Sequence, residues 1–163
     1  MEKQLIQQCG KLLADNKITM ALAESATAGL VTGAFSLCAN AGEFLMGGLV
    51  CYDVSIKEQL LHVSPALVEE FTPESTEVTF AIAKGLASII PADLHIGITG
   101  LTRPGGSETK EKPVGTIFFC GIFGENKLFE EKVVFKGNQE LIINQAIVYL
   151  AKLLITALSK TKK

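Results

Sequence analysis

The chain has 163 residues, of which 48% are hydrophobic and 20% charged, and its formal net charge at pH 7 is −2. This length predicts a single domain over residues 1–163. The lysines and the single arginine are scattered, and only segment 160–163 concentrates them. The charge pattern therefore argues against nucleic acid as a partner, because a nucleic-acid binder needs a clustered positive surface.

The cysteines and the ends of the chain carry no targeting or metal-binding signal. The four cysteines lie far apart with no CxxC pair, so neither a zinc site nor a disulfide framework is predicted. The N-terminal segment 1–16 has polar residues throughout, unlike a signal peptide. No run approaches the roughly 18 apolar residues of a membrane span. We expect a cytoplasmic protein with no membrane partner and no metal.

The first half of the chain alternates helices and strands. Hydrophobic residues at helical spacing predict a helix over 2–15, and a short strand follows at 18–23. A helix rich in small residues then opens at Ser25 or Thr27 and runs to Leu37. Further on, the sequence predicts a buried strand at 47–52, a short helix at 55–61, a helix starting at Ser64-Pro65, and a long helix from Thr72-Pro73-Glu74 to Ile89.

The second half of the chain ends in a hairpin and a long helix. A buried strand at 94–99 precedes a loop, and strands at 114–123 and 127–135 form a hairpin around 124–126. A helix over 138–159 closes the chain. This order of elements predicts an α/β fold in which a mixed sheet is sandwiched between helices.

The ends of the predicted strands carry the residues best suited to chemistry. Ser25 follows an apolar strand and precedes a helix, so its hydroxyl lies among unpaired N–H groups that suit an oxyanion. An N-cap serine is the commoner reading of such a position. Lys57 could serve as its base if burial keeps the amine neutral, and Tyr52 could hydrogen-bond either group. Read alone, Lys57 is a surface lysine and Tyr52 a strand-end aromatic residue.

The loop over 99–113 contains the pair Gly105-Gly106. Adjacent glycines let backbone N–H groups approach a ligand closely, as binding of a phosphate requires. A long surface loop without function is an equally good reading. His62 and His95 are interpreted as structural residues.

Four ordered segments resemble one protein family. They are AESATAGL at 23–30, GGLVCYDVSIKEQLLHVS at 47–64, ITGLTRPGG at 98–106 and EKPVGTIFF at 111–119. The chain resembles the C-terminal domain family of competence/damage-inducible protein A, CinA, whose stand-alone members are nicotinamide-nucleotide amidohydrolases. The resemblance implies a three-layer α/β/α sandwich with a mixed, mostly parallel sheet. It also implies a homo-oligomer, for which we expect a dimer.

The same resemblance implies an activity and a site. The activity is hydrolysis of nicotinamide mononucleotide to nicotinate mononucleotide and ammonia, with neither metal nor cofactor. Ser25 would be the nucleophile, Lys57 its base and Tyr52 a proton relay, with an acyl-enzyme stabilised by N–H groups near 26–28. The implied substrate-binding residues are Ala26, Thr27, Ala28, Gly29, Thr99, Gly100, Gly105 and Gly106.

Several positions depart from the family's usual sequence. Ala28 stands where glycine is usual, so its Cβ could crowd the oxyanion, and Asp53 could keep Lys57 protonated. Gln139 and Ile143 stand where members often carry arginine, and we expect Arg103 to bind the substrate phosphate in their place. The departures at 26, 28, 53, 54, 139 and 143 leave open a second function, a nucleotide-binding protein without efficient turnover.

Overall fold

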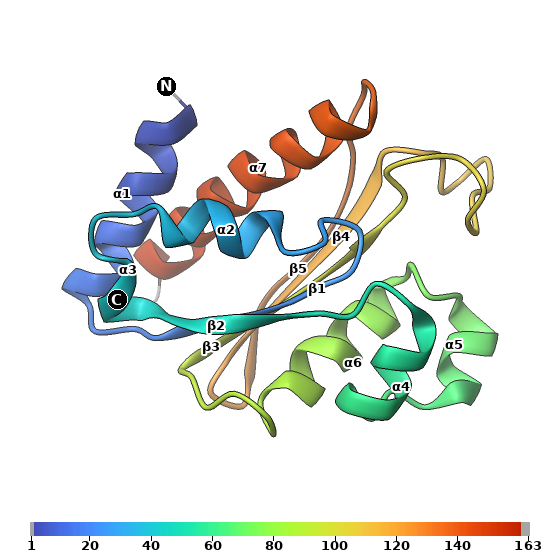
Figure 1. Ribbon diagram of the computed structural model, residues 1–163, viewed down its shortest axis with the longest axis horizontal. Coiled ribbons are helices and arrows are strands. Elements are labelled where there is room, and N and C mark those ends of the chain that lie inside the picture. Colours follow the sequence, from blue (N-terminus) through green and yellow to red (C-terminus); the bar gives the residue numbers. More distant parts are fainter. Residues whose placement is uncertain (1, 161–163) are drawn as a thin grey trace.

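The computed structural model describes residues 2–160 as a five-stranded sheet covered by helices on both faces (Figure 1). The strand order is β2-β1-β3-β4-β5. The strands are β1 (Met20–Glu24), β2 (Leu45–Val50), β3 (Leu94–Gly100), β4 (Thr116–Phe123) and β5 (Asn126–Val134). Strand β1 pairs in parallel with β2 and β3, whereas β4 is antiparallel to both β3 and β5. The mixed sheet that the sequence predicts is confirmed, and four of its five strands point in one direction.

The helices form one layer on each side of this sheet (Figure 1). They are α1 (Glu2–Asp15), α2 (Leu30–Ser36), α3 (Ala41–Phe44), α4 (Val54–Leu61), α5 (Pro65–Phe71), α6 (Thr76–Leu86) and α7 (Gln139–Lys160). Helices α1, α2, α3 and α7 lie on one face, and α4, α5 and α6 on the other. The three-layer sandwich is confirmed.

Strand β1 separates the two cores because successive side chains of a strand point to opposite faces. Met20 and Leu22 pack in the larger core cluster with α1, α2 and α7. Ala21 and Ala23 pack in the cluster beneath α4 and α6. All five residues of the strand are buried. Its carboxyl end therefore lies inside the molecule, beside the carboxyl ends of β2 and β3.

Helix α7 is long and apolar enough to cross a membrane, contrary to the expectation from the sequence. Its 22 residues contain an 18-residue window with a mean hydropathy of 1.9. Polar residues interrupt the run, which is why no continuous apolar segment is visible, but the average stays high. Core helices can have the same length and hydropathy, and α7 packs eight buried residues into the larger core. The helix is therefore weak evidence for a span.

Two predicted helix starts lie several residues too early. The segment 25–29 is a loop before α2, because Ala28 and Gly29 have φ angles of 49° and 90°, outside the right-handed helical region. Before α6 the N-cap is Ser75, whose Oγ accepts a hydrogen bond from the Val78 N–H at 3.2 Å. Thr72 instead ends α5, with φ at 70°.

Gly97 sets the distance between β3 and α6. A Cβ at this position would collide with the backbone carbonyl oxygen of Thr79 and approach the Ala83 side chain to 3.1 Å. We expect Gly97→Ala to lower the free energy of unfolding by about 3 kcal/mol, because overpacking forces the helix off the sheet. This corresponds to a fall in Tm of roughly 6–10 °C in thermal unfolding.

Gly33→Ala is the matched control for that measurement. A Cβ at Gly33, inside α2, meets nothing within 4 Å. Alanine at this exposed helical position should stabilise the protein by about 0.5–1 kcal/mol. Equal Tm values for the two variants would contradict the close packing of α6 on β3.

Candidate active site

Ser25 is the first residue after β1, at the edge of the sheet where the parallel strands end. Its N–H donates to the Ile98 carbonyl oxygen at 2.9 Å, which extends the pairing of β1 with β3 by one residue. The residue is buried, with 6% of its surface exposed. The sheet itself therefore fixes the position of the hydroxyl.

Glu24 takes the capping role that a serine at position 25 could have had. Its carboxylate accepts hydrogen bonds from the N–H groups of Gly29, Val31 and Thr32, which open α2, at 2.7–3.1 Å. It also accepts from the hydroxyls of Thr27 and Thr32, each at 2.6 Å. Ser25 is consequently not an N-cap, and its hydroxyl remains free for another partner. Glu24 is a structural residue of the site that is not predicted above, although a carboxylate at the end of an otherwise apolar strand indicates such a role.

The hydrogen-bond partner of the Ser25 hydroxyl is Lys57. The Lys57 Nζ lies 3.0 Å from the Ser25 Oγ, although 32 residues separate the two in the chain. Helix α4 begins just beyond the end of β2, and its first turns carry Lys57 over the end of β1. Only 1% of the lysine's surface is exposed. The contact between serine and lysine that the sequence predicts is present.

The other neighbours of Lys57 orient its amine. The Nζ donates to the Cys51 carbonyl oxygen at 2.6 Å and to the Tyr52 carbonyl oxygen at 3.3 Å. A neutral amine has two N–H bonds and one lone pair. If the two carbonyls accept both N–H groups, the lone pair is left to accept the Ser25 O–H. Burial lowers the pKa of Lys57, and this outweighs the opposing charges of Cys51, Glu74 and Asp53.

Asp53 does not pair with Lys57. Its carboxylate caps α4, accepting from the Ser55 N–H at 2.9 Å and from the Ser55 hydroxyl at 2.5 Å. Among the charges that raise the pKa of Lys57 its contribution is the smallest. Asp53 raises the pKa of Lys57, as the sequence predicts, but burial outweighs this contribution because the carboxylate is engaged at the helix start.

Tyr52 meets Lys57 through its backbone and not through its phenol. The side chain is 48% exposed, and within residues 2–160 its hydroxyl makes no hydrogen bond. The ring lines the cavity beside Ser25. The contact of a phenol with the serine or lysine is thus absent, and a relay role for Tyr52 stays a prediction.

Ser25 opens into a cavity of about 200 Å³ at this edge of the sheet. The cavity is lined by Ser25, Ala26, Tyr52, Glu74, Gly100, Leu101, Thr102, Arg103, Pro104, Gly105 and Gly106. Within the described part of the chain, the N–H groups of Ala26 and Thr27 donate to no acceptor. Ala26 lines the cavity, so its free N–H can hold an oxyanion there, whereas Thr27 is completely buried outside it.

Four of the implied substrate-binding residues lie outside this cavity. Thr27 and Thr99 are completely buried, because their hydroxyls bond Glu24 and Thr79. Ala28 and Gly29 turn toward α2 and do not line the cavity, so the Ala28 Cβ is not among the groups beside Ser25. Of segment 26–28 only Ala26 lines the cavity, and the Ala28 N–H already donates to the Ser25 carbonyl oxygen at 3.1 Å.

The glycine pair lines the cavity, but its N–H groups have an internal acceptor. Gly105 and Gly106 each donate to one carboxylate oxygen of Glu108 at 2.8 Å. Both hydrogen bonds lower the pKa of Glu108, and the bond from Gly105 has the larger effect. The two N–H groups suit an anion, as the sequence predicts, but the anion that they bind is the Glu108 carboxylate of the same chain.

Glu74 is a cavity residue that the sequence analysis did not assign to the site. It precedes the Ser75 cap of α6, and its Oε2 accepts from the Ser107 hydroxyl at 2.5 Å. Lys112 ties the same region together, donating to Ser107 Oγ, Thr72 Oγ1 and the Glu74 carbonyl oxygen. The sequence showed only a helix start at Thr72–Glu74, because the contact with the loop spans more than 30 residues.

Arg103 also lines the cavity and is exposed. Within residues 2–160 its guanidinium makes no ion pair or hydrogen bond. Gln139, at the start of α7, donates to the Thr102 hydroxyl at 3.2 Å and so supports the cavity wall from behind. Ile143 is part of the larger core. The single arginine is thus the cation that this cavity offers to an anionic ligand.

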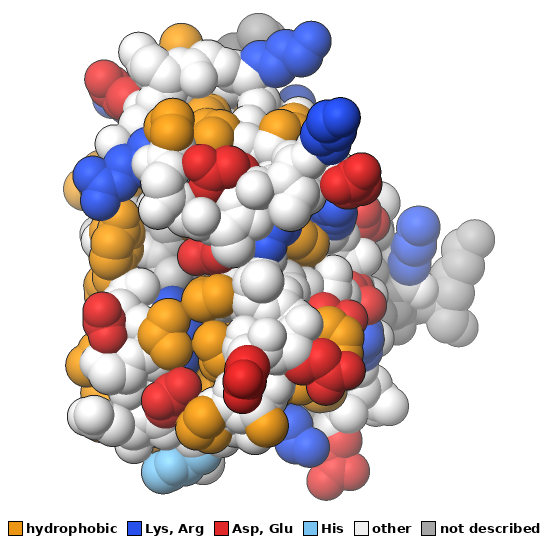
Figure 2. Space-filling view, turned by 90° about the vertical axis from the view of Figure 1, so that its right-hand side faces the viewer, with side chains coloured by type: hydrophobic (Ala, Val, Ile, Leu, Met, Phe, Trp, Pro, Cys, Tyr) orange, Lys and Arg blue, Asp and Glu red, His pale blue; other side chains and the backbone are white. Residues whose placement is uncertain are grey.

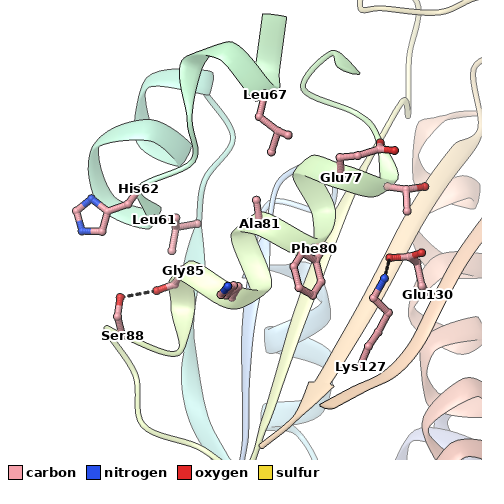
Figure 3. Close-up of a pocket in the computed structure, with 12 residues that line it drawn as sticks. Leu61, His62, Leu67, Glu77, Phe80, Ala81, Gly85, Ser88, Lys127 and Glu130 are labelled. Atoms are coloured by element: carbon pink, nitrogen blue, oxygen red, sulfur yellow. Dashed lines mark hydrogen bonds and ion pairs between the residues drawn. The ribbon is translucent and has the colours of Figure 1, made fainter. Parts of the chain in front are cut away.

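The end of the molecule that holds this loop carries acidic, basic and apolar side chains in a mixed arrangement (Figure 2). A larger cavity, of about 670 Å³, lies between α6, the end of α4 and β5 (Figure 3). There Lys127 pairs with Glu130 and stands over the Phe80 ring, 5.0 Å from its centroid. Ser88 donates to the Gly85 carbonyl oxygen. The serine that lines it, Ser88, forms no hydrogen bond with a lysine among the described residues, so the smaller cavity is the candidate active site.

Residues 2–158 match the family described as CinA C-terminal domain. A CinA-like protein of Mycobacterium marinum is 37% identical over 150 residues, covering 92% of this chain and 35% of that protein. A putative competence-damage inducible protein of Moorella thermoacetica is 33% identical over 144 residues, covering 86% of this chain and 34% of that protein. The chain therefore spans about a third of the length of these curated relatives.

Solved structures share the fold. The crystal structure of a CinA superfamily protein from Enterobacter cloacae is 29% identical, with a TM-score of 0.87 over 96% of this chain and 92% of that chain. A CinA superfamily protein from Klebsiella pneumoniae 700603 has a TM-score of 0.92 over 98% of this chain and 99% of that chain. At 23% identity, the second likeness concerns the fold alone.

Proposed function

Because the chain belongs to the CinA C-terminal domain family, we propose that it is an amidohydrolase that converts nicotinamide mononucleotide to nicotinate mononucleotide and ammonia. The observation that carries this proposal is the buried contact of 3.0 Å between Lys57 Nζ and Ser25 Oγ. A desolvated amine beside a hydroxyl is an arrangement that activates a serine without histidine. The free N–H group of Ala26 beside it supports acyl transfer in particular.

The first half of the reaction forms an acyl-enzyme. Neutral Lys57 removes the proton from the Ser25 hydroxyl as Oγ attacks the carboxamide carbon. The N–H group of Ala26 donates to the oxygen that becomes negative. The C–N bond then breaks, and the Lys57 ammonium returns its proton to the leaving nitrogen, which departs as ammonia. An ester between Ser25 and the nicotinoyl carbonyl remains.

The second half repeats the same steps with water. Lys57, neutral again, takes a proton from a water molecule as the water oxygen attacks the ester carbon, and the same N–H group holds the oxyanion. When the C–O bond to Ser25 breaks, the ammonium protonates Oγ and the acid product is released, losing its remaining proton to solvent to become the carboxylate. One amine thus serves as base and acid in each half, and no further group is required.

The direct test is ammonia release by the purified protein from nicotinamide mononucleotide, with the Ser25→Ala protein measured alongside. Turnover that needs Ser25 would support the amidohydrolase. Binding of the mononucleotide in calorimetry without turnover would overturn it in favour of a nucleotide-binding protein. Asp53, one of the residues that motivated that second function, raises the pKa of Lys57 by less than burial lowers it.

Arg103 is expected to bind the substrate phosphate, because it is exposed at the cavity and pairs with no other described residue. Arg103→Ala should raise KM for nicotinamide mononucleotide by about 10- to 100-fold, the effect of losing a charge-assisted bidentate contact. KM for nicotinamide riboside, which lacks the phosphate, should barely change. Steady-state kinetics on both substrates measures this, and equal effects on the two would contradict the assignment.

A further inference from the structure

The cavity beside Ser25 is lined by one acidic side chain, that of Glu74, and one basic side chain, that of Arg103. They do not pair with each other, since neither forms an ion pair within residues 2–160. Opposite charges left unpaired in one small cavity leave both available to a ligand. Arg103 has an expected partner in a phosphate, whereas Glu74 has no part in the acyl-transfer steps.

The position of Glu74 is fixed, but one of its oxygens is free. The Oε2 accepts from Ser107, and Lys112 holds the Glu74 backbone and the Ser107 hydroxyl at 2.9 Å and 2.6 Å. Lys112 makes no contact with the carboxylate itself. Within the described residues Oε1 has no hydrogen-bond donor. The chain therefore holds the Glu74 carboxylate rigidly at the cavity, near Lys57 and Lys112 but without an ion pair among the described residues.

We propose that Glu74 is a specificity-determining residue that selects a substrate whose amide-bearing ring is positively charged. The inference rests on the proposed function, whose substrate has a cationic pyridinium ring and an anionic phosphate. The two charged side chains of the cavity complement these two groups. A fixed carboxylate attracts such a ring more strongly inside a protein than in water, because the surroundings screen the charges less.

The same charge favours release of the product. Hydrolysis turns the neutral carboxamide into a carboxylate, which adds a negative charge to the ring. Glu74 attracts the substrate ring and repels this new charge in the same cavity. The carboxylate thus discriminates between the two sides of the reaction as well as between rings.

The test compares oxidised nicotinamide mononucleotide, whose ring is cationic, with its reduced dihydro form, whose ring is neutral. Both carry the same phosphate, and calorimetry on Ser25→Ala protein measures binding without hydrolysis. We expect Glu74→Gln to weaken binding of the oxidised form about tenfold and to leave the reduced form unchanged. Glu77→Gln, at an exposed position in the first turn of α6, removes the same charge away from the cavity and is the matched control.

Loss of Glu74 also removes a charge that raises the pKa of Lys57. A less protonated Lys57 would favour cation binding, so this side effect opposes the expected loss and cannot produce it. Ser107→Ala is the second variant, because it frees Oε2 but keeps the carboxylate charge. It should retain the preference for the oxidised form.

Equal weakening of both forms by Glu74→Gln would overturn the inference, and so would no change in either. These outcomes do not depend on turnover, because they are measured on protein without the nucleophile. Absence of ammonia release from the parent protein would contradict the proposed function. Even then, a Glu74→Gln variant that no longer prefers the oxidised form would show that Glu74 determines the preference for a cationic ring.

Discussion

Ser25→Ala is expected to reduce ammonia release from nicotinamide mononucleotide by about 10⁴-fold or more, the scale of loss when a catalytic nucleophile is removed. The Ser25 Oγ is the only serine oxygen in contact with Lys57 among the described residues. Without it, the amine could only activate water directly. The cavity wall stays in place, so binding of the mononucleotide should change little.

The measurement is single-turnover and steady-state ammonia release, with Ser88→Ala prepared in parallel. Ser88 is exposed and its hydroxyl bonds the Gly85 carbonyl oxygen, far from the proposed chemistry. This control should keep the parental rate. Thermal unfolding checks that Ser25→Ala is folded, since the lost hydrogen bond costs only about 1 kcal/mol. Undiminished turnover in folded Ser25→Ala protein would remove the acyl-enzyme from the mechanism.

The order and type of the main elements could be predicted because the signals are local. The apolar strand around Ala21 and Ala23 and the helical spacing of α1 depend on residues near each other in the chain. The short helix α3 (Ala41–Phe44) was not predicted, since four residues give no periodic pattern. The start of α2 was missed because Glu24 caps it from the preceding strand, an arrangement that resembles no usual N-cap signal.

The candidate site was predictable only in part, for a related reason. The meeting of Ser25 and Lys57 follows from the parallel pairing of β1 with β2, which brings the two strand ends together. By contrast, the place of Glu74 depends on a contact between the start of α6 and a loop more than 30 residues later. Thr27 and Thr99, which the family resemblance implies as binding residues, do not line the cavity, because their hydroxyls bond Glu24 and Thr79 inside the protein.

The protonation of Lys57 should control the pH dependence of the reaction. The lysine acts as a base only when neutral, so the rate should be low below its pKa and rise to a plateau above it. Burial lowers that pKa from the usual range of a lysine, which moves the rise toward neutral pH. Glu74 raises the same pKa, and Glu74→Gln should therefore shift the rise to lower pH.

Lys57→Met is expected to lower kcat by about 10³-fold, within the range that a positioned general base contributes. Methionine has a similar length and no ionisable group, so it fills the buried position without accepting a proton. The residual rate should lose the rise with pH that the parent shows. Lys152→Met, at an exposed position of α7, is the control and should keep both rate and profile. A Lys57→Met protein with the parental pH profile would show that another group takes the serine proton, because no titration of an absent amine can shape the rate.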